Sequence, residues 1–118
     1  MKDYKELDLW KESRKLVSDV YQLAADLPSD EKFGLKSQLQ RAAVSVPSNI
    51  AEGMGRSTSS DTQRFLVIAR GSLFELETQL YLCSDLKLIS DAELKNVNEQ
   101  VLLCIRLLNG YLKYLKSK

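Results

Sequence analysis

Residues 34–56 read Gly34-Leu-Lys-Ser-Gln-Leu-Gln-Arg-Ala-Ala-Val-Ser-Val-Pro-Ser-Asn-Ile-Ala-Glu-Gly-Met-Gly-Arg56, and this stretch decides the fold. At about 100° per residue, its apolar side chains fall on one side of a helix and its polar side chains on the other. The polar side is a stripe of Ser, Asn, Arg and one Glu, whereas a solvated face is normally rich in Lys and Glu. Such side chains make fixed hydrogen bonds, so we expect something to be held against this stripe.

Pro47 falls within the helical pattern of this stretch. Proline lacks a backbone donor, and its ring crowds the carbonyl of Ala43. We therefore predict a kink or a short break at residues 44–46, where Ser45 and Ser48 are placed to satisfy the backbone groups that are freed. The alternative is that the bend splits the segment into two helices, with a cap at residue 45 or 46.

The rest of the chain continues the helical periodicity. We expect helices over about residues 8–27, 31–55, 58–86 and 90–115, with Thr58-Ser-Ser-Asp61 and Ser90-Asp-Ala-Glu93 as N-terminal capping boxes. No strand-like alternation is present, and the connections are short enough to favour antiparallel neighbours. The sequence therefore predicts an all-α fold: one antiparallel up-down-up-down four-helix bundle spanning residues 1–118, its second helix kinked near Pro47.

The third helix has more apolar surface than an isolated bundle requires. Its core stripe is expected to be Phe65, Ala69, Leu73, Leu76, Leu80 and Cys83. A second apolar series, Val67, Phe74 and Tyr81, recurs every seven residues on a different side of the helix. This series predicts either a subunit interface or unusually deep burial within the chain, since exposed contiguous aromatic residues are an association liability.

Composition limits the class of protein. The chain has 118 residues, 44% hydrophobic and 28% charged, which is ordinary for one soluble domain. It contains no apolar run of membrane-spanning length and opens with no signal peptide, so we expect a cytoplasmic protein without a membrane partner. Cys83 and Cys104 lie among leucines on helical patterns, which favours buried free thiols over a disulfide or a reactive site.

Charge is nearly balanced overall but uneven along the chain. The net charge of +1 argues against a strong general affinity for nucleic acid. Residues 1–31 and 71–99 are net negative, whereas residues 32–70 and 100–118 are net positive. These blocks suit helices that attract one another, or a folded molecule with one basic and one acidic face.

The residues that most catalytic and metal sites use are missing. The sequence has no histidine, which removes Ser-His-Asp and Cys-His catalysis, the usual zinc sets and the Glu-x-x-His pattern of di-iron bundles. Gly53-Met-Gly55 is too short for a phosphate-binding loop. Glu75 and Glu77 lie two residues apart on a helix and point away from each other. We therefore expect no enzymatic activity, no metal and no cofactor.

Polar residues on the second and third helices have two interpretations. Arg41 and Glu52 lie eleven residues apart, as do Arg64 and Glu75, so antiparallel helices would pair Arg41 with Glu75 and Glu52 with Arg64. The structural interpretation is ion pairs that fix the register of helices within or between subunits. It gives the candidate interface or register residues Arg41, Ser45, Ser48, Asn49, Glu52, Val67, Phe74, Glu75 and Tyr81. The functional interpretation is a phosphate- or nucleic-acid-binding groove with donors Lys36, Arg41, Arg56 and Arg64.

Four segments together resemble a known family. They are Leu9-Trp-Lys-Glu-Ser, Glu31-Lys-Phe-Gly-Leu35, Gln38-Leu-Gln-Arg-Ala-Ala-Val-Ser-Val-Pro-Ser-Asn-Ile-Ala-Glu-Gly53 and Gly71-Ser-Leu-Phe-Glu-Leu-Glu-Thr-Gln79. In this order they are similar to the four-helix-bundle proteins often encoded in 23S ribosomal RNA intervening sequences. The resemblance covers nearly the whole chain, and the segment that ends at Gly53 is its most specific part.

The resemblance implies a small antiparallel bundle and a ring- or barrel-shaped homopentamer, but no established reaction. The related accessory proteins of diversity-generating retroelements associate with reverse transcriptase and nucleic acid through a basic surface. The near-neutral charge of this chain departs from that pattern. Two hypotheses follow: a non-enzymatic oligomeric assembly protein, or an RNA-binding accessory protein whose basic patch is repeated by the oligomer.

Overall fold

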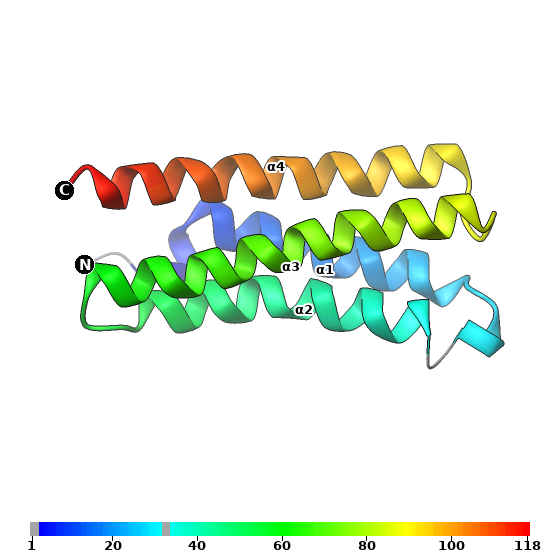
Figure 1. Cartoon of the computed structure of the whole chain (residues 1–118), viewed down its shortest axis with the longest axis horizontal. Helices are drawn as coiled ribbons and strands as arrows, with labels where there is room; N and C mark the ends of the chain where they lie inside the picture. Colours follow the sequence, from blue (N-terminus) through cyan, green and yellow to red (C-terminus); the bar gives the residue numbers. More distant parts are fainter. Residues whose placement is uncertain (1–2, 32–33) are drawn as a thin grey trace.

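Four long helices form a closed antiparallel bundle in the computed structural model, which describes residues 3–31 and 34–118 (Figure 1). They are α1 (Asp8–Ala25), α2 (Leu35–Met54), α3 (Ser59–Asp85) and α4 (Asp91–Lys116), with short 3₁₀ turns η1 (Tyr4–Glu6) and η2 (Ser29–Glu31). Each helix packs against the two next to it in the order α1, α2, α3, α4 and back to α1, and α2 with α3 make the most extensive contact. The predicted fold class is therefore confirmed.

A single apolar core runs along the bundle. Leu16 of α1, Leu39 of α2, Leu73 of α3 and Leu108 of α4 are each fully buried within it. On α1 the core stripe runs from Leu9 to Leu27, just beyond the end of the helix, and its members are buried. The molecule measures 46 × 23 × 20 Å along its principal axes, which makes its long sides, rather than its ends, the large surfaces.

The helix ends follow local side-chain chemistry. The Ser90 hydroxyl accepts from the Glu93 amide at 3.1 Å while the Glu93 carboxylate accepts from the Ser90 amide at 2.9 Å, so the predicted capping box is complete. At the start of α3 the Thr58 hydroxyl accepts from the Asp61 amide. The end of α3 lacks the usual glycine: Lys87 has φ of 61°, while the amides of Lys87 and Leu88 donate back to the carbonyls of Ser84 and Cys83.

Two expectations for α2 need revision. The helix begins at Leu35 rather than near residue 31, because Ser29–Glu31 forms a separate 3₁₀ turn. Residues 32 and 33 of the predicted helix lie outside the described residues. The helix then passes through Pro47 without interruption, so the alternative of two separate helices is wrong. The local bend expected at Pro47 stays a prediction.

One core position in α3 was misplaced. Phe65 is half-buried, and its neighbour Leu66 takes the core position instead. The remaining members of the predicted stripe, from Ala69 to Cys83, are buried as expected. Phe65 lies instead beside the last turn of α2, where it packs against a glycine and two arginines, as described below.

Candidate assembly surface and polar seam

Part of the polar stripe of α2 is used inside the chain. The hydroxyls of Ser45 on α2 and Ser72 on α3 share a hydrogen bond of 2.8 Å. The Asn49 side-chain amide donates to both the hydroxyl and the carbonyl of Ser45, one turn earlier. Further along the same seam, the Gln79 amide donates to the Gln38 side chain at 3.4 Å. The Ser45–Ser72 and Gln38–Gln79 bonds join α2 to α3 at two levels, whereas the Asn49 bonds stay within α2.

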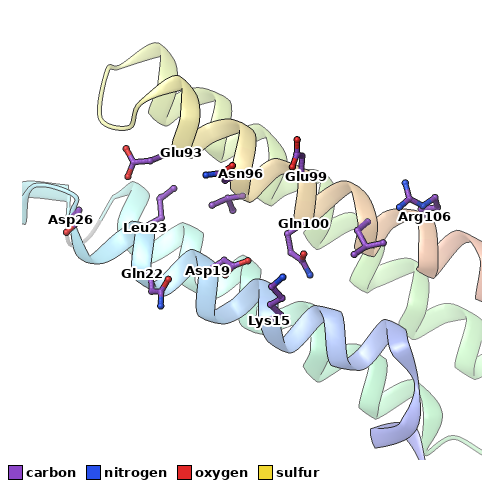
Figure 2. A pocket seen from close by; sticks show the side chains of 12 residues that line it. Lys15, Asp19, Gln22, Leu23, Asp26, Glu93, Asn96, Glu99, Gln100 and Arg106 are labelled. Carbon is purple, nitrogen blue, oxygen red and sulfur yellow. The ribbon is translucent and has the colours of Figure 1, made fainter.

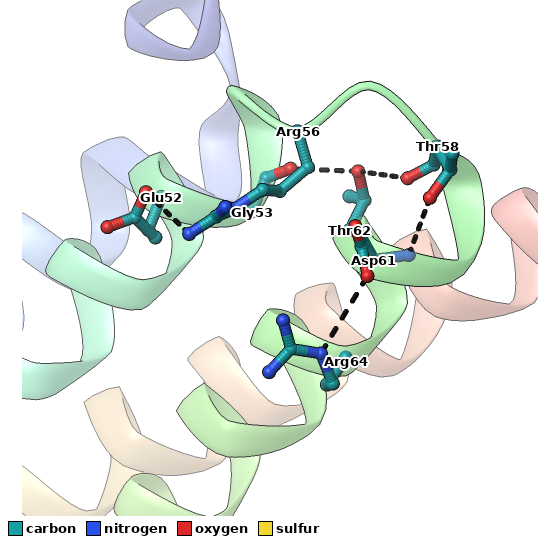
Figure 3. A network of polar contacts seen from close by, with 7 residues as sticks. All are labelled: Glu52, Gly53, Arg56, Thr58, Asp61, Thr62 and Arg64. Carbon is teal, nitrogen blue, oxygen red and sulfur yellow. Dashed lines mark hydrogen bonds and ion pairs between the residues drawn. The ribbon is translucent and has the colours of Figure 1, made fainter.

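The two helices approach most closely at Gly53. A β-carbon at this position would lie 2.9 Å from the β-carbon of Phe65 and 3.1 Å from the Thr62 carbonyl oxygen. The Thr62 hydroxyl donates to the Gly53 carbonyl at 2.8 Å, and the Arg56 amide donates to the same carbonyl (Figure 3). Glycine is therefore required here by contact between two helices rather than by a turn.

The expected ion pairs between α2 and α3 do not form within the described chain. The Ser45–Ser72 bond sets a register in which Arg41 comes level with Glu75, yet neither takes part in an ion pair among residues 3–31 and 34–118. Glu52 pairs with Arg56 at 3.2 Å, one turn along its own segment (Figure 3). Arg64 pairs with Asp61 at 3.8 Å. Local partners one turn away are closer to these charges than partners across the helices.

The four candidate phosphate donors are not brought to one place. Lys36 and Arg56 lie near opposite ends of α2, separated by about 30 Å at the rise of an α-helix. Arg56 and Arg64 do converge, because their guanidinium carbons lie 4.5 and 4.7 Å from the centre of the Phe65 ring. Their carboxylate partners at Glu52 and Asp61 balance this cluster in charge. Arg41 and the exposed Ser48 lie elsewhere on the outer side of α2.

The surplus apolar series of α3 is open to solvent. Val67, Phe74 and Tyr81 are 45%, 49% and 50% exposed, so the alternative of deep burial within the chain is wrong. Two more apolar residues of α3, Ile68 and Leu82, are exposed to a similar degree. We call this set, Val67, Ile68, Phe74, Tyr81 and Leu82, the α3 outer face. It points away from the core along much of the helix.

A second, smaller apolar surface, which was not predicted, lies on the side of the bundle formed by α1 and α2. Tyr21 of α1 and Val44 of α2 are 44% and 42% exposed. Glu12 of α1 is bonded to α4, and helical spacing puts Tyr21 on the other flank of α1. On α2, Asn49 is bonded to Ser45 on the flank that faces α3, and helical spacing puts Val44 on the flank away from it. Both therefore lie on the α1/α2 side. In the sequence, Trp10, Val17 and Tyr21 recur at helical spacing and widen the apolar stripe of α1, which is the pattern that indicates this surface.

A groove of about 710 Å³ runs between α1 and α4, and it was also not predicted (Figure 2). Its walls carry carboxylates, among them Asp19 and Asp26 of α1 and Glu93 of α4, with Lys15 and Arg106 as the basic members. The lining is thus largely polar and charged, unlike the apolar pockets that usually bind small molecules. Within residues 3–31 and 34–118, no group of three His, Cys, Asp or Glu side chains is arranged to hold a metal ion.

Both cysteines are buried free thiols, as expected. Burial raises the pKa of the Cys104 thiol to about 11. A weak hydrogen bond from the Ser13 hydroxyl, at 4.0 Å, lowers this pKa, whereas the negative charges of Glu12 and Asp19 raise it further. Burial also raises the pKa of Cys83, with a smaller contribution from Glu31. Neither side chain is poised as a thiolate nucleophile.

Comparisons with known proteins agree with this architecture. A family model described as 23S rRNA-intervening sequence protein matches residues 5–110. Among solved structures, the chain is similar to a protein of unknown function from the S23 ribosomal protein family of Bacteroides thetaiotaomicron, with a TM-score of 0.83. The two are 23% identical, and the likeness covers 89% of this chain and 95% of the other. Among curated proteins, none matches the chain. No helix in the described part of the chain is both long enough and apolar enough to span a bilayer.

Proposed function

The chain belongs to the 23S rRNA-intervening sequence protein family, and from that premise we propose that it is a non-enzymatic homo-oligomer that assembles through its helix faces. The observation that carries the proposal is the α3 outer face, whose apolar side chains each stay between 43% and 50% exposed in the described chain. The resemblance to ring-shaped homopentamers supplies the proposed stoichiometry of five.

The size of the α3 outer face supports this role. An aromatic side chain buries about 200 Å² when it is fully covered, so five half-exposed apolar side chains leave on the order of 400 Å² open. A standard interface buries about 800 Å² on each partner and is a little over half apolar. The α3 outer face therefore matches the apolar share of one such interface.

The second apolar surface supports a ring rather than a simple pair. The α3 outer face and the Tyr21–Val44 surface belong to different helices and are therefore two different patches of the same bundle. A contact between two different patches is heterologous, and repeated copies of it generate a ring when the rotation closes. In such a ring, the Tyr21–Val44 surface of each subunit would cover the α3 outer face of one neighbour. Its own α3 outer face would be covered by the Tyr21–Val44 surface of the neighbour on its other side.

Matched tyrosine substitutions test the proposal. Tyr81 and Tyr114 are equally exposed, at 50% and 51%, but Tyr114 lies near the end of α4 and contacts Tyr111 instead of the α3 outer face. We expect Tyr81→Lys to raise the subunit dissociation constant about 30-fold or more, which corresponds to losing an aromatic residue at an interface centre. Tyr114→Lys should leave the constant nearly unchanged. Equal effects of the two substitutions in sedimentation experiments would contradict the proposal.

RNA binding is the second role that we propose, and it is favoured by the convergence of Arg56 and Arg64 beside the Phe65 ring. An oligomer would repeat this cluster at every subunit, which concentrates its charge. The role predicts RNA binding that weakens steeply with added salt and falls when Arg56 or Arg64 is replaced by Ala. Binding that is unchanged by both substitutions would exclude this surface. Glu52 and Asp61 neutralise the two arginines, which weakens their attraction for phosphate. Assembly is therefore the better supported role.

A further inference from the structure

Gly71 has no structural reason within its own chain. It lies in the middle of α3, where glycine is less favourable than every residue except proline. Its φ is not in the left-handed region that would require glycine. Beyond its chain neighbours and the nearby backbone of its own helix, a β-carbon at this position would meet nothing within 4 Å. Nothing in the protomer therefore explains why the helix carries a residue that weakens it.

The same chain shows what such a glycine is for. Gly53, inside α2, is needed because a β-carbon there would lie 2.9 Å from Phe65 on the neighbouring helix. Glycine within a helix allows another backbone to come unusually close. At Gly53 the approaching helix belongs to the same chain, whereas at Gly71 the corresponding space is open.

The surroundings of Gly71 point to an apolar partner. Of the four residues one turn away, three are half-exposed members of the α3 outer face, Val67, Ile68 and Phe74, and the fourth is the exposed Glu75. Gly71 therefore lies within the α3 outer face and makes a shallow notch between its large side chains. A helix packed against this face would reach the α3 backbone at the notch.

We infer that a helix of a second copy of this chain packs across α3 at Gly71, which is the point of closest approach between the two subunits. This inference rests on the proposed assembly and deepens it. The occupant is a second copy because each chain offers both the notched face and a second apolar surface of its own at Tyr21 and Val44. The open area of the α3 outer face also matches what one stable interface requires of each partner.

The test is a glycine substitution with a matched control on α4. Gly110 also lies inside a helix, and a β-carbon there meets nothing within 4 Å beyond its chain neighbours and its own helix backbone. Two of its four neighbours one turn away, Arg106 and Lys113, are charged, against one of four for Gly71. We expect Gly71→Ala to raise the subunit dissociation constant at least tenfold, while Gly110→Ala changes it less than twofold. Gly71→Leu should weaken assembly further, although it adds apolar surface. Far-UV circular dichroism of the variants should show undiminished helix content, because alanine and leucine are better helix formers than glycine.

The outcomes separate this inference from the proposal beneath it. A wild-type chain that stays monomeric overturns both. A wild-type oligomer that Tyr81→Lys dissociates, but that Gly71→Ala leaves intact, overturns the close approach at Gly71 alone. Stronger assembly of Gly71→Leu would also overturn it, because an open notch would gain contact from a larger apolar side chain.

Discussion

The α-carbon of Gly53 lies so near Phe65 that a β-carbon at residue 53 would stand 2.9 Å from the β-carbon of the phenylalanine. This contact explains why Phe65 lies at the junction of α2 and α3 while Leu66 takes the core position. It also explains how the Thr62 hydroxyl reaches the Gly53 carbonyl at 2.8 Å. The pair fixes the end of the most extensive helix contact in the bundle.

We expect Gly53→Ala to destabilise the fold even though alanine is the better helix former. Overpacking between two backbones that cannot easily separate costs about 1–3 kcal/mol in the free energy of unfolding, which exceeds the helical gain of about 1 kcal/mol. Urea denaturation of the variant measures this change. A variant as stable as the wild type would show that α2 and α3 can move apart at this point at little cost.

The hydroxyl pair of Ser45 and Ser72 should contribute measurably to the α2–α3 register. We expect a double-mutant cycle with Ser45→Ala and Ser72→Ala to give a coupling free energy of about 0.5–1.5 kcal/mol, as for other hydrogen bonds between partly buried side chains. Additive single substitutions would indicate that water replaces the bond without loss. Ser48→Ala, at an exposed position on the same helix, is the control and should change the free energy of unfolding by less than about 0.5 kcal/mol.

Alkaline pH should destabilise the protein through Cys104. Its thiol has an ordinary pKa of 9.0 when exposed, and burial raises the folded pKa to about 11. Between these values the folded chain holds a proton that the unfolded chain has released, so the free energy of unfolding falls as pH rises. The full loss is roughly 2–3 kcal/mol. Cys104→Ala should flatten the slope of unfolding free energy between pH 9 and 11, and an unchanged slope would assign it to other groups.

Lys87 offers a stabilising substitution. It adopts a left-handed conformation that costs a residue with a β-carbon about 1 kcal/mol, and glycine avoids this cost. We expect Lys87→Gly to raise the free energy of unfolding by up to about 1 kcal/mol, measured by urea denaturation. The neighbouring Leu86→Gly is the contrasting change, because Leu86 has a negative φ of −83° and gains no such relief. If Leu86→Gly stabilised the chain equally, the explanation from the positive φ of Lys87 would be wrong.

Helical periodicity was enough to predict the bundle, because buried side chains recur at helical spacing from Leu9 to Leu27 and from Val97 to Leu112. It misplaced Phe65 by one position, since the close contact at Gly53 depends on how two helices meet and leaves no periodic trace. The interhelical ion pairs do not form within the described chain for a related reason: Glu52 and Arg64 each have an oppositely charged residue one turn away. Val67, Phe74 and Tyr81 were recognised as surplus, but spacing alone could not decide between a subunit interface and burial within the chain.

The mass of the native particle tests the central claim most directly. Multi-angle light scattering on the purified 118-residue chain at micromolar concentrations should give a multiple of the 13.4 kDa protomer mass, with five subunits as the proposed number. Replacing Tyr81 with Lys should shift that mass toward a single protomer. A wild-type mass of one protomer across the concentration range would mean that the α3 outer face remains uncovered in solution, and would contradict the account.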